Sequence, residues 1–214
     1  MEILTEIQYL PPVSYFVRLG AFHGLILEGW EHYQKQSYRN RCHILGANKV
    51  AELNIPVRKT AQKMLIRDAE IDYDQKWLPV HWRTICSAYG KAPFFEYYEE
   101  LFRNIFFKKH KFLFDLNMEL LQLILKLIDW KKEVRISERY SVSDGFKADN
   151  VFDGRGQVHP KVQSGQEGEI RFARYTQLFG KDFVENLSIV DLLFCEGPES
   201  SQVLNKCQIV GMNN

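Results

Sequence analysis

An excess of charge of either sign is missing from this chain of 214 residues, because 28 Lys and Arg residues stand against 27 Asp and Glu residues. Proteins that bind nucleic acid through their overall field carry a basic excess. We therefore expect no nucleic acid partner. An anionic small molecule would have to be bound by a local group of cations.

Cysteine is scarce, and its pattern is not typical of a metal site. The four cysteines, at positions 42, 86, 195 and 207, form no CxxC or Cys/His spacing. His43 beside Cys42 supplies at most half of a closed set of ligands. Phosphate loops of the GxGxxG or GxxxxGK kind are missing as well. We expect no metal, and the sequence leaves the cofactor unknown.

Long hydrophobic runs are also lacking. The most apolar stretch, Leu116 to Ile128, is interrupted by Asn117, Glu119 and Lys126, so it does not predict a membrane span. The start of the chain, MEILTEIQYLPP, has neither the basic nor the apolar region of a signal peptide. We expect a cytoplasmic protein with reduced cysteines.

The residues that are abundant indicate a folded protein. A content of 45% hydrophobic and 14% aromatic residues argues against disorder. At this length we expect one α/β domain over residues 1–214, a mixed β-sheet packed by several α-helices. The oligomeric state stays open.

Apolar spacing predicts a β-α-β opening, with a strand over Ile3–Tyr9, a helix over Pro12–Leu19 and a strand over Gly24–Leu27. Gln8 would then lie at the carboxyl end of the first strand, the edge where open α/β sheets place ligands. We further expect strands over Val50–Val57, Met64–Ile71 and Glu133–Ile136, helices over Lys76–Tyr89, Pro93–Phe107 and Phe114–Ile128, and a mobile loop over 143–169.

The tract from Ile170 to Ser200 is the densest in structural signals. Tyr175 and Gln177 continue a strand-like alternation that Gly180 ends. Ser188 stands three residues before Asp191 and ahead of an apolar run, which predicts a capping box at the start of a helix. The alternative is that Ser188 and Asp191 belong to an active site.

Positive charge concentrates at Arg39, Asn40 and Arg41. Guanidinium groups match the paired oxygens of phosphate or carboxylate, and in an extended segment Arg39 and Arg41 point to one side, as a clamp on an anion requires. The same letters are also typical of a solvated basic edge strand.

Two histidines are candidates for proton transfer. His81 follows Trp77 by one helical turn and is either a general base or a buried histidine of the core. His159 and Lys161 lie in the predicted loop, where they could close over a substrate or form an exposed turn.

Five blocks in fixed order resemble the WbqC-like protein family. They are IQYLPPVSYF at 7–16, SYRNR at 37–41, LNIPV at 53–57, KWLPVHWRTICSAYGKAPFFEYY at 76–98 and the tract from Ile170 to Ser200. The resemblance covers most of the chain and implies a bacterial protein of O-antigen or other surface polysaccharide biosynthesis. The chain departs from the family pattern in its short segment 143–169. Glu28 and Glu31 stand where similar proteins tend to have aspartates, which weakens an acid role for them.

The resemblance implies a pathway, and within it we consider two functions. The first is an enzyme that transfers a small acyl or aminoacyl group to an amino sugar on a nucleotide or lipid carrier. In this function Arg39 and Arg41 bind an anionic substrate such as a sugar nucleotide. His81 is the base, and Asp191 orients a base or polar group. The second is a non-catalytic sugar-nucleotide-binding or scaffolding protein. Glycosyl transfer is a third option, but Asp72 and Asp74 are weak evidence for it. The first function predicts that the substrate residues Gln8, Arg39, Asn40, Arg41, Tyr175 and Gln177 meet His81 and Asp191 in one cleft.

Overall fold

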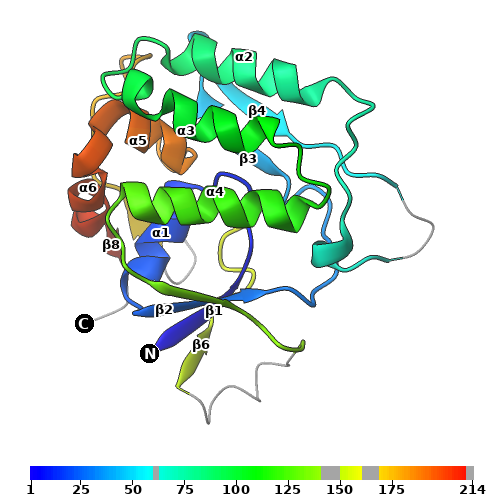
Figure 1. The fold of residues 1–214 in the computed structure, drawn as a ribbon. Coiled ribbons are helices and arrows are strands. Elements are labelled where there is room, and N and C mark those ends of the chain that lie inside the picture. Colours follow the sequence, from blue (N-terminus) through cyan, green and yellow to red (C-terminus); the bar gives the residue numbers. More distant parts are fainter. Residues whose placement is uncertain (60–62, 141–149, 161–168, 211–214) are drawn as a thin grey trace.

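A parallel sheet lies at one end of the fold in a computed structural model, which describes residues 1–59, 63–140, 150–160 and 169–210 (Figure 1, bottom). Its strand order is β5-β2-β1-β6, and all three pairings are parallel. The carboxyl ends of the strands therefore share one edge. The strands are β1 (Glu2–Glu6), β2 (Gly24–Glu28), β5 (Glu133–Ile136) and β6 (Val151–Asp153).

The predicted β-α-β opening is confirmed. Helix α1 (Val13–Gly20) connects β1 to β2 and begins directly after Pro12, whose fixed φ suits the start of a helix. The parallel register places Glu6 opposite Glu28, so the two strands end side by side. Two carboxylates thus meet at the edge of the sheet.

An antiparallel hairpin forms next, from β3 (Arg41–Leu45) and β4 (Val50–Asn54). The predicted strand over Met64–Ile71 is wrong, because this segment contains the 3-10 turn η1 (Ile66–Asp68). The buried residues of this segment are Ile66, Ala69 and Ile71, and the spacing of three between the first two fits a turn better than a strand. The partner of β4 is consequently the segment that begins with Arg41.

Helices α2 (Trp77–Tyr89), α3 (Phe95–Phe107) and α4 (Leu113–Leu127) confirm the helical middle of the chain within two residues at each end. The remaining elements are α5 (Ile189–Glu196), η3 (Gly197–Glu199), α6 (Ser200–Lys206) and the short pair β7 (Ile170–Arg171) and β8 (Gln208–Ile209). The α/β class is confirmed, with parallel and antiparallel pairings in separate sheets. In the described ranges no helix is long and apolar enough to cross a membrane.

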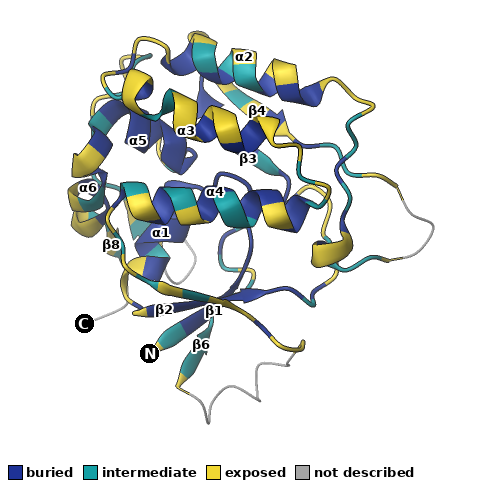
Figure 2. Ribbon diagram, viewed as in Figure 1, coloured by how far each residue is buried: buried dark blue, intermediate teal, exposed yellow. Residues whose placement is uncertain are grey.

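The buried residues form one cluster that reaches from the sheet to the helices (Figure 2). Its largest fully buried side chains are aromatic, among them Tyr9, Tyr15, Tyr89, Phe102 and Phe194. Every residue of α5 except Glu196 is buried, so this helix runs through the interior. The core therefore fixes the position of residues on α2, α5 and the ends of the strands together.

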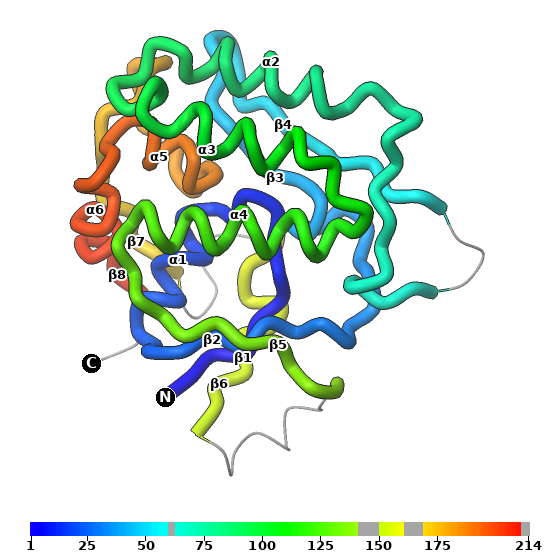
Figure 3. The backbone as a smooth tube through the Cα atoms, in the orientation of Figure 1, coloured from blue at the N-terminus to red at the C-terminus, as the bar shows by residue number. Residues whose placement is uncertain are grey.

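The predicted mobile loop over 143–169 contains an element of the sheet. Strand β6 pairs with β1 through Glu2, Ile3 and Leu4, and Figure 3 shows it beside β1. Three residues are too few to give a period-two pattern, which is why the sequence does not reveal this strand. Residues 143–149 and 161–168 of the same prediction lie outside the described residues.

Gly197 allows a close approach between α5 and the start of α3. Its φ is +53°, and a Cβ at this position would collide with the ring of Phe94. Gly197→Ala should lower the free energy of unfolding by more than about 2 kcal/mol, since backbone strain and overpacking add. Urea denaturation followed by circular dichroism measures the loss.

Gly180→Ala is the matched control for backbone strain alone. Gly180 has a φ of +86°, but the nearest atom to its Cβ would be Asp182 O at an ordinary 3.5 Å. We expect a loss of about 1 kcal/mol there. Equal losses in the two variants would contradict the packing argument for Gly197.

Candidate functional site

Three buried glutamates gather where the parallel strands end. Glu6 is the last residue of β1 and Glu28 the last of β2, and their side chains are 1% and 0% exposed. Glu31 follows β2 by three residues and is also buried. This edge is the usual ligand position in open α/β sheets. We call Glu6, Glu28, Glu31 and their polar partners the strand-edge cluster.

Glu28 has a cation among its partners. Its Oε1 accepts hydrogen bonds from Trp30 N (2.9 Å) and Ser137 Oγ (2.7 Å), and its Oε2 accepts one from Arg155 Nη1 (3.0 Å). Arg155 also pairs with Asp153 at 2.7 Å. The hydrogen bond from Arg155 lowers the pKa of Asp153, and burial opposes it. Arg155 thus ties the end of β6 to the end of β2.

Glu31 forms a buried two-point ion pair with Arg39. The distances are 2.7 Å from Nε to Oε1 and 2.5 Å from Nη2 to Oε2. Burial acts to lower the pKa of Arg39, but the hydrogen bonds and charge of Glu31 outweigh it, so that pKa is raised. Arg39 is therefore a charged residue held inside the protein by Glu31.

Glu6 differs from its two neighbours because its hydrogen-bond donors are all neutral. Oε1 accepts from Gln8 Nε2 (3.0 Å), and Oε2 accepts from Gly156 N (3.0 Å) and Thr5 Oγ1 (3.4 Å). Gln8 is itself 1% exposed, and its Oε1 has no hydrogen-bond partner. Among the residues that the structure describes, no cation contacts this buried carboxylate.

Asp191 is the centre of a second buried group. Ser188 caps α5 as predicted, through its side chain and Val190 N. Ser188 N donates to His43 O, and Asp191, in the first turn of α5, faces other donors. These donors are Tyr89 Oη at 2.8 Å, Tyr175 Oη at 2.6 Å and Gln177 Nε2 at 3.1 Å.

The contacts of Asp191 hold the irregular segment before α5 in place. Gln177 also bonds both backbone groups of Val184, so the loop is tied to itself and to the helix. Burial raises the pKa of Asp191, while the hydrogen bonds from Tyr175, Tyr89 and Gln177 oppose the rise. All three donors satisfy one carboxylate that is 1% exposed, which is the environment of a structural acid.

His81 lies on α2 and is 4% exposed. Its Nδ1 is 3.1 Å from Tyr9 Oη, and Trp77 packs edge-on against its ring. Burial lowers the pKa of His81 to about 4, and a hydrogen bond with the backbone of Asn54 opposes the shift. The imidazole is therefore neutral at neutral pH.

The predicted anion clamp does not form. Arg39 is paired with Glu31, while Arg41 Nη1 lies 2.8 Å from Glu52 Oε2. Asn40 between them donates to Asn54 Oδ1 at 2.6 Å. Both arginines of the SYRNR block are thus paired with glutamates of this chain, although Asn40 Oδ1 and Arg41 Nε are buried without a hydrogen-bond partner.

The structure places the predicted site residues in separate hydrogen-bonded groups. Gln8 joins Glu6, His81 joins Tyr9, and Asp191 joins Tyr175 and Gln177, and no hydrogen bond or ion pair among the described residues links these three groups. His159 is half-buried and has partners of its own. Lys161 lies outside the described residues.

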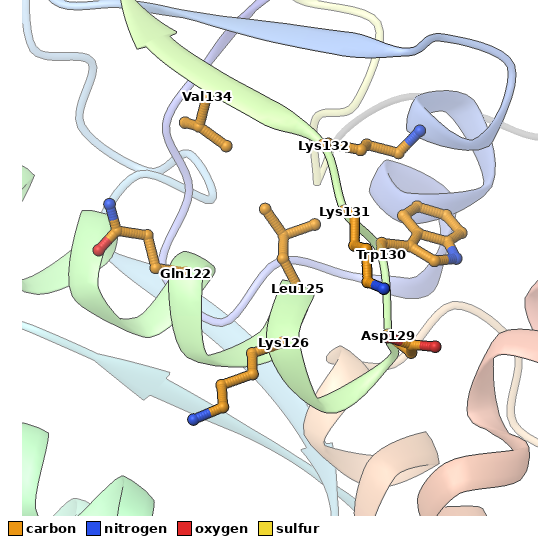
Figure 4. A pocket seen from close by; sticks show the side chains of 8 residues that line it. All are labelled: Gln122, Leu125, Lys126, Asp129, Trp130, Lys131, Lys132 and Val134. Carbon is orange, nitrogen blue, oxygen red and sulfur yellow. The ribbon is translucent and has the colours of Figure 1, made fainter.

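A pocket of about 470 Å³ lies elsewhere, between the end of α4 and β5 (Figure 4). Lys132 at its rim donates to Phe22 O, and burial lowers the pKa of this lysine. The pocket contains no residue of the strand-edge cluster and none of the predicted site residues. It is lined by Gln122, Leu125, Lys126, Asp129, Trp130, Lys131, Lys132 and Val134.

Sequence reasoning missed most of the strand-edge cluster. Glu6 and Ser137 were not singled out, and the acid roles of Glu28 and Glu31 were discounted. A signal was available for Glu28, which directly follows the predicted strand Gly24–Leu27. Glu6 lies inside the predicted strand Ile3–Tyr9 and is a strand end only in the structure. Arg155 has no such signal, since its place depends on β6.

Comparison with known proteins gives one result. A family model described as the WbqC-like protein family matches residues 7–161 and 166–203. No curated protein and no solved structure matches the chain significantly.

The low pKa of His81 predicts an acid-dependent loss of stability. The folded pKa of about 4 lies below the ordinary 6.5, so the unfolded state binds the proton first as the pH falls. The contribution of His81 to stability is fully present above its pKa in the unfolded state, and it declines as the pH falls toward its pKa in the folded state. Between about pH 7 and about pH 4.5 the free energy of unfolding should fall by on the order of 2 kcal/mol from this residue.

Urea denaturation of His81→Asn at both pH values measures this contribution. The variant should be less stable at neutral pH and should lose less stability on acidification than the wild type. His32→Asn, at an exposed histidine, is the control and should follow the wild type. If the free energy of unfolding of His81→Asn depends on pH as it does in the wild type, His81 is not buried as a neutral imidazole.

Asp191→Asn should also destabilise the protein, because the new amide N–H₂ would face hydroxyl and amide donors. We expect a loss of about 1–3 kcal/mol in the free energy of unfolding. Protease cleavage near residue 180 should report loosening of the preceding segment. Asp182→Asn, at an exposed position, should leave both readouts as in the wild type.

Proposed function

The chain belongs to the WbqC-like protein family, which suggests a role related to polysaccharide biosynthesis, and from this premise we propose that it is a group-transfer enzyme. It transfers a small acyl or aminoacyl group to an amino sugar in the bacterial cytoplasm. The strand-edge cluster is the proposed site. The observation that carries this choice is the burial of three carboxylates at the carboxyl edge of a parallel sheet, where charge is costly to bury and ligands commonly bind.

The chemistry needs a proton acceptor beside the acceptor amine. The amine nitrogen attacks the acyl carbon, a C–N bond forms, and the bond from that carbon to the leaving oxygen or sulfur of an activated donor breaks. The amine proton passes to a carboxylate of the cluster, and the leaving group takes up a proton. General-base assistance of this kind is typically worth about 10²–10⁴-fold in rate.

The contacts of the other candidates favour a supporting role. His81 is neutral and bonded to Tyr9, and Asp191 is bonded by three donors. Arg39 and Arg41 could bind an anionic handle only by exchanging their glutamate partners. We therefore assign the proton transfer to the strand-edge cluster in place of His81.

A second candidate is a non-catalytic protein that binds a sugar nucleotide or supports a complex of the same pathway. The observation that favours it is the burial of both His81 and Asp191 in contacts that fully occupy them. This function needs the fold and a binding site, but no proton acceptor.

Mass spectrometry of the surface glycan separates the two candidates. Deletion of the gene should remove one acyl or aminoacyl substituent from the glycan. Complementation with Glu28→Gln should fail to restore it, because the variant keeps the shape of the side chain and loses the carboxylate. Glu52→Gln, at a part-exposed glutamate paired with Arg41, should restore it.

Protein abundance and melting temperature of both variants show whether the fold persists. An unchanged glycan in the deletion strain would refute a transfer function. If deletion removes the glycan substituent and complementation with Glu28→Gln fully restores it, the result would favour the binding or scaffolding role.

A further inference from the structure

Glu6 is the exceptional member of the strand-edge cluster. Glu28 faces Arg155 and Glu31 faces Arg39, whereas in the described ranges Glu6 pairs with no cation. Both oxygens of Glu6 accept hydrogen bonds, one from Gln8 Nε2 and the other from Gly156 N. An ionised carboxylate suits two accepting oxygens, because a protonated one must donate through one of them.

An ionised and buried group without a counter-charge is expensive. Neutral donors offset part of the desolvation cost, and a cation within contact distance offsets more. Arg155 divides its contacts between Glu28 and Asp153, and Arg39, which pairs with Glu31, acts on Glu6 through its charge without contacting it. Among the described residues Glu6 therefore has no cation within contact distance.

Gln8 adds an independent observation. Its Nε2 is held by Glu6 Oε1 and by Val158 O, both at 3.0 Å, so the orientation of the amide is fixed. Its Oε1 is buried with no donor, although a buried acceptor is normally satisfied. The unmatched charge of Glu6 and the unused acceptor of Gln8 are therefore neighbours.

The missing partner must supply positive charge and hydrogen-bond donors together. A primary ammonium group supplies both, with three N–H donors on a compact cation. A metal ion is less suitable, because the described residues contain no group of three His, Cys, Asp or Glu side chains that could hold one.

We propose that Glu6 and Gln8 form a subsite for the primary ammonium group of a ligand, and that this ligand is an amino sugar. The inference rests on the proposed function for the sugar part of the ligand. The ammonium part rests on the contacts of Glu6 and Gln8 alone.

The subsite lies one layer of chain below the surface. Gly156, which covers Glu6 through its N–H group, is itself exposed and has a φ of +75°. A Cβ at this position would meet no atom within 4 Å, so open space lies beside it. The exposed backbone of Gly156 therefore lies between Glu6 and this open space, and a ligand that reaches Glu6 from there must displace the Gly156 N–H group.

Calorimetric titration of the purified full chain with three sugars tests the proposal. The sugars are D-glucosamine, N-acetyl-D-glucosamine and D-glucose, which differ in the group at carbon 2. The wild type should bind glucosamine at least about tenfold more tightly than the other two, as expected for loss of a charge-assisted hydrogen bond. Both Glu6→Gln and Gln8→Met should abolish this preference.

Glu2→Gln is the matched control, because Glu2 lies on the same strand at the opposite end and pairs with exposed Arg135. It should keep the preference for glucosamine. Circular dichroism melting shows whether each variant folds. If Glu6→Gln does not fold, Gln8→Met decides the outcome.

Three results would overturn the proposal: no binding of glucosamine at tens of millimolar, equal binding of the three sugars, or a preference that survives in folded Glu6→Gln or Gln8→Met. Competition by potassium chloride, but not by equal choline chloride, would also overturn it and assign the subsite to a metal cation. Glucosamine binding with an unchanged glycan in the deletion strain would refute the transfer function and leave the subsite standing. A changed glycan without glucosamine binding would refute the subsite and leave the transfer function standing.

Discussion

The need to neutralise carboxylates buried at the ends of parallel strands governs the structure around the sheet. The register of β1 and β2 puts Glu6 beside Glu28, and neither side chain reaches solvent. Their donors come from the ends of β5 and β6 and from the segment beyond them, through Ser137, Arg155 and Gly156. The cluster thus links four strand ends, and breaking one partner of such a buried ion pair is costly.

The same principle operates in the helical half, with neutral donors in place of arginines. Asp191 is satisfied by two tyrosines and Gln177, and His81 is kept neutral by burial beside Tyr9. These residues have the chemistry of an active site but are occupied by contacts that stabilise the fold. Residue type alone does not distinguish the two uses, because the difference lies in whether the polar atoms remain available.

In the strand-edge cluster an unused acceptor lies beside a carboxylate that, in the described ranges, has only neutral donors. Asn40 Oδ1, Trp77 Nε1 and Asn117 Oδ1 are also buried without a partner. The position of Gln8 Oε1 next to Glu6 is what distinguishes it from these atoms. This asymmetry within one cluster is the physical basis for proposing a cationic ligand at the edge of the sheet.

The sequence by itself determined the local elements. The β-α-β opening, the three helices of the middle and the cap of α5 by Ser188 follow from periodicity and from residues close together in the chain.

Which polar groups meet depends on the tertiary structure. Arg155 reaches Glu28 across 127 positions, and β6, which brings it there, is three residues long. Arg39 and Arg41 were predicted to bind one anion, but Glu31 and Glu52 neutralise them separately. Spacing fixes which side of an element a side chain occupies, whereas the partner of a buried charge depends on segments that only the folded core brings together.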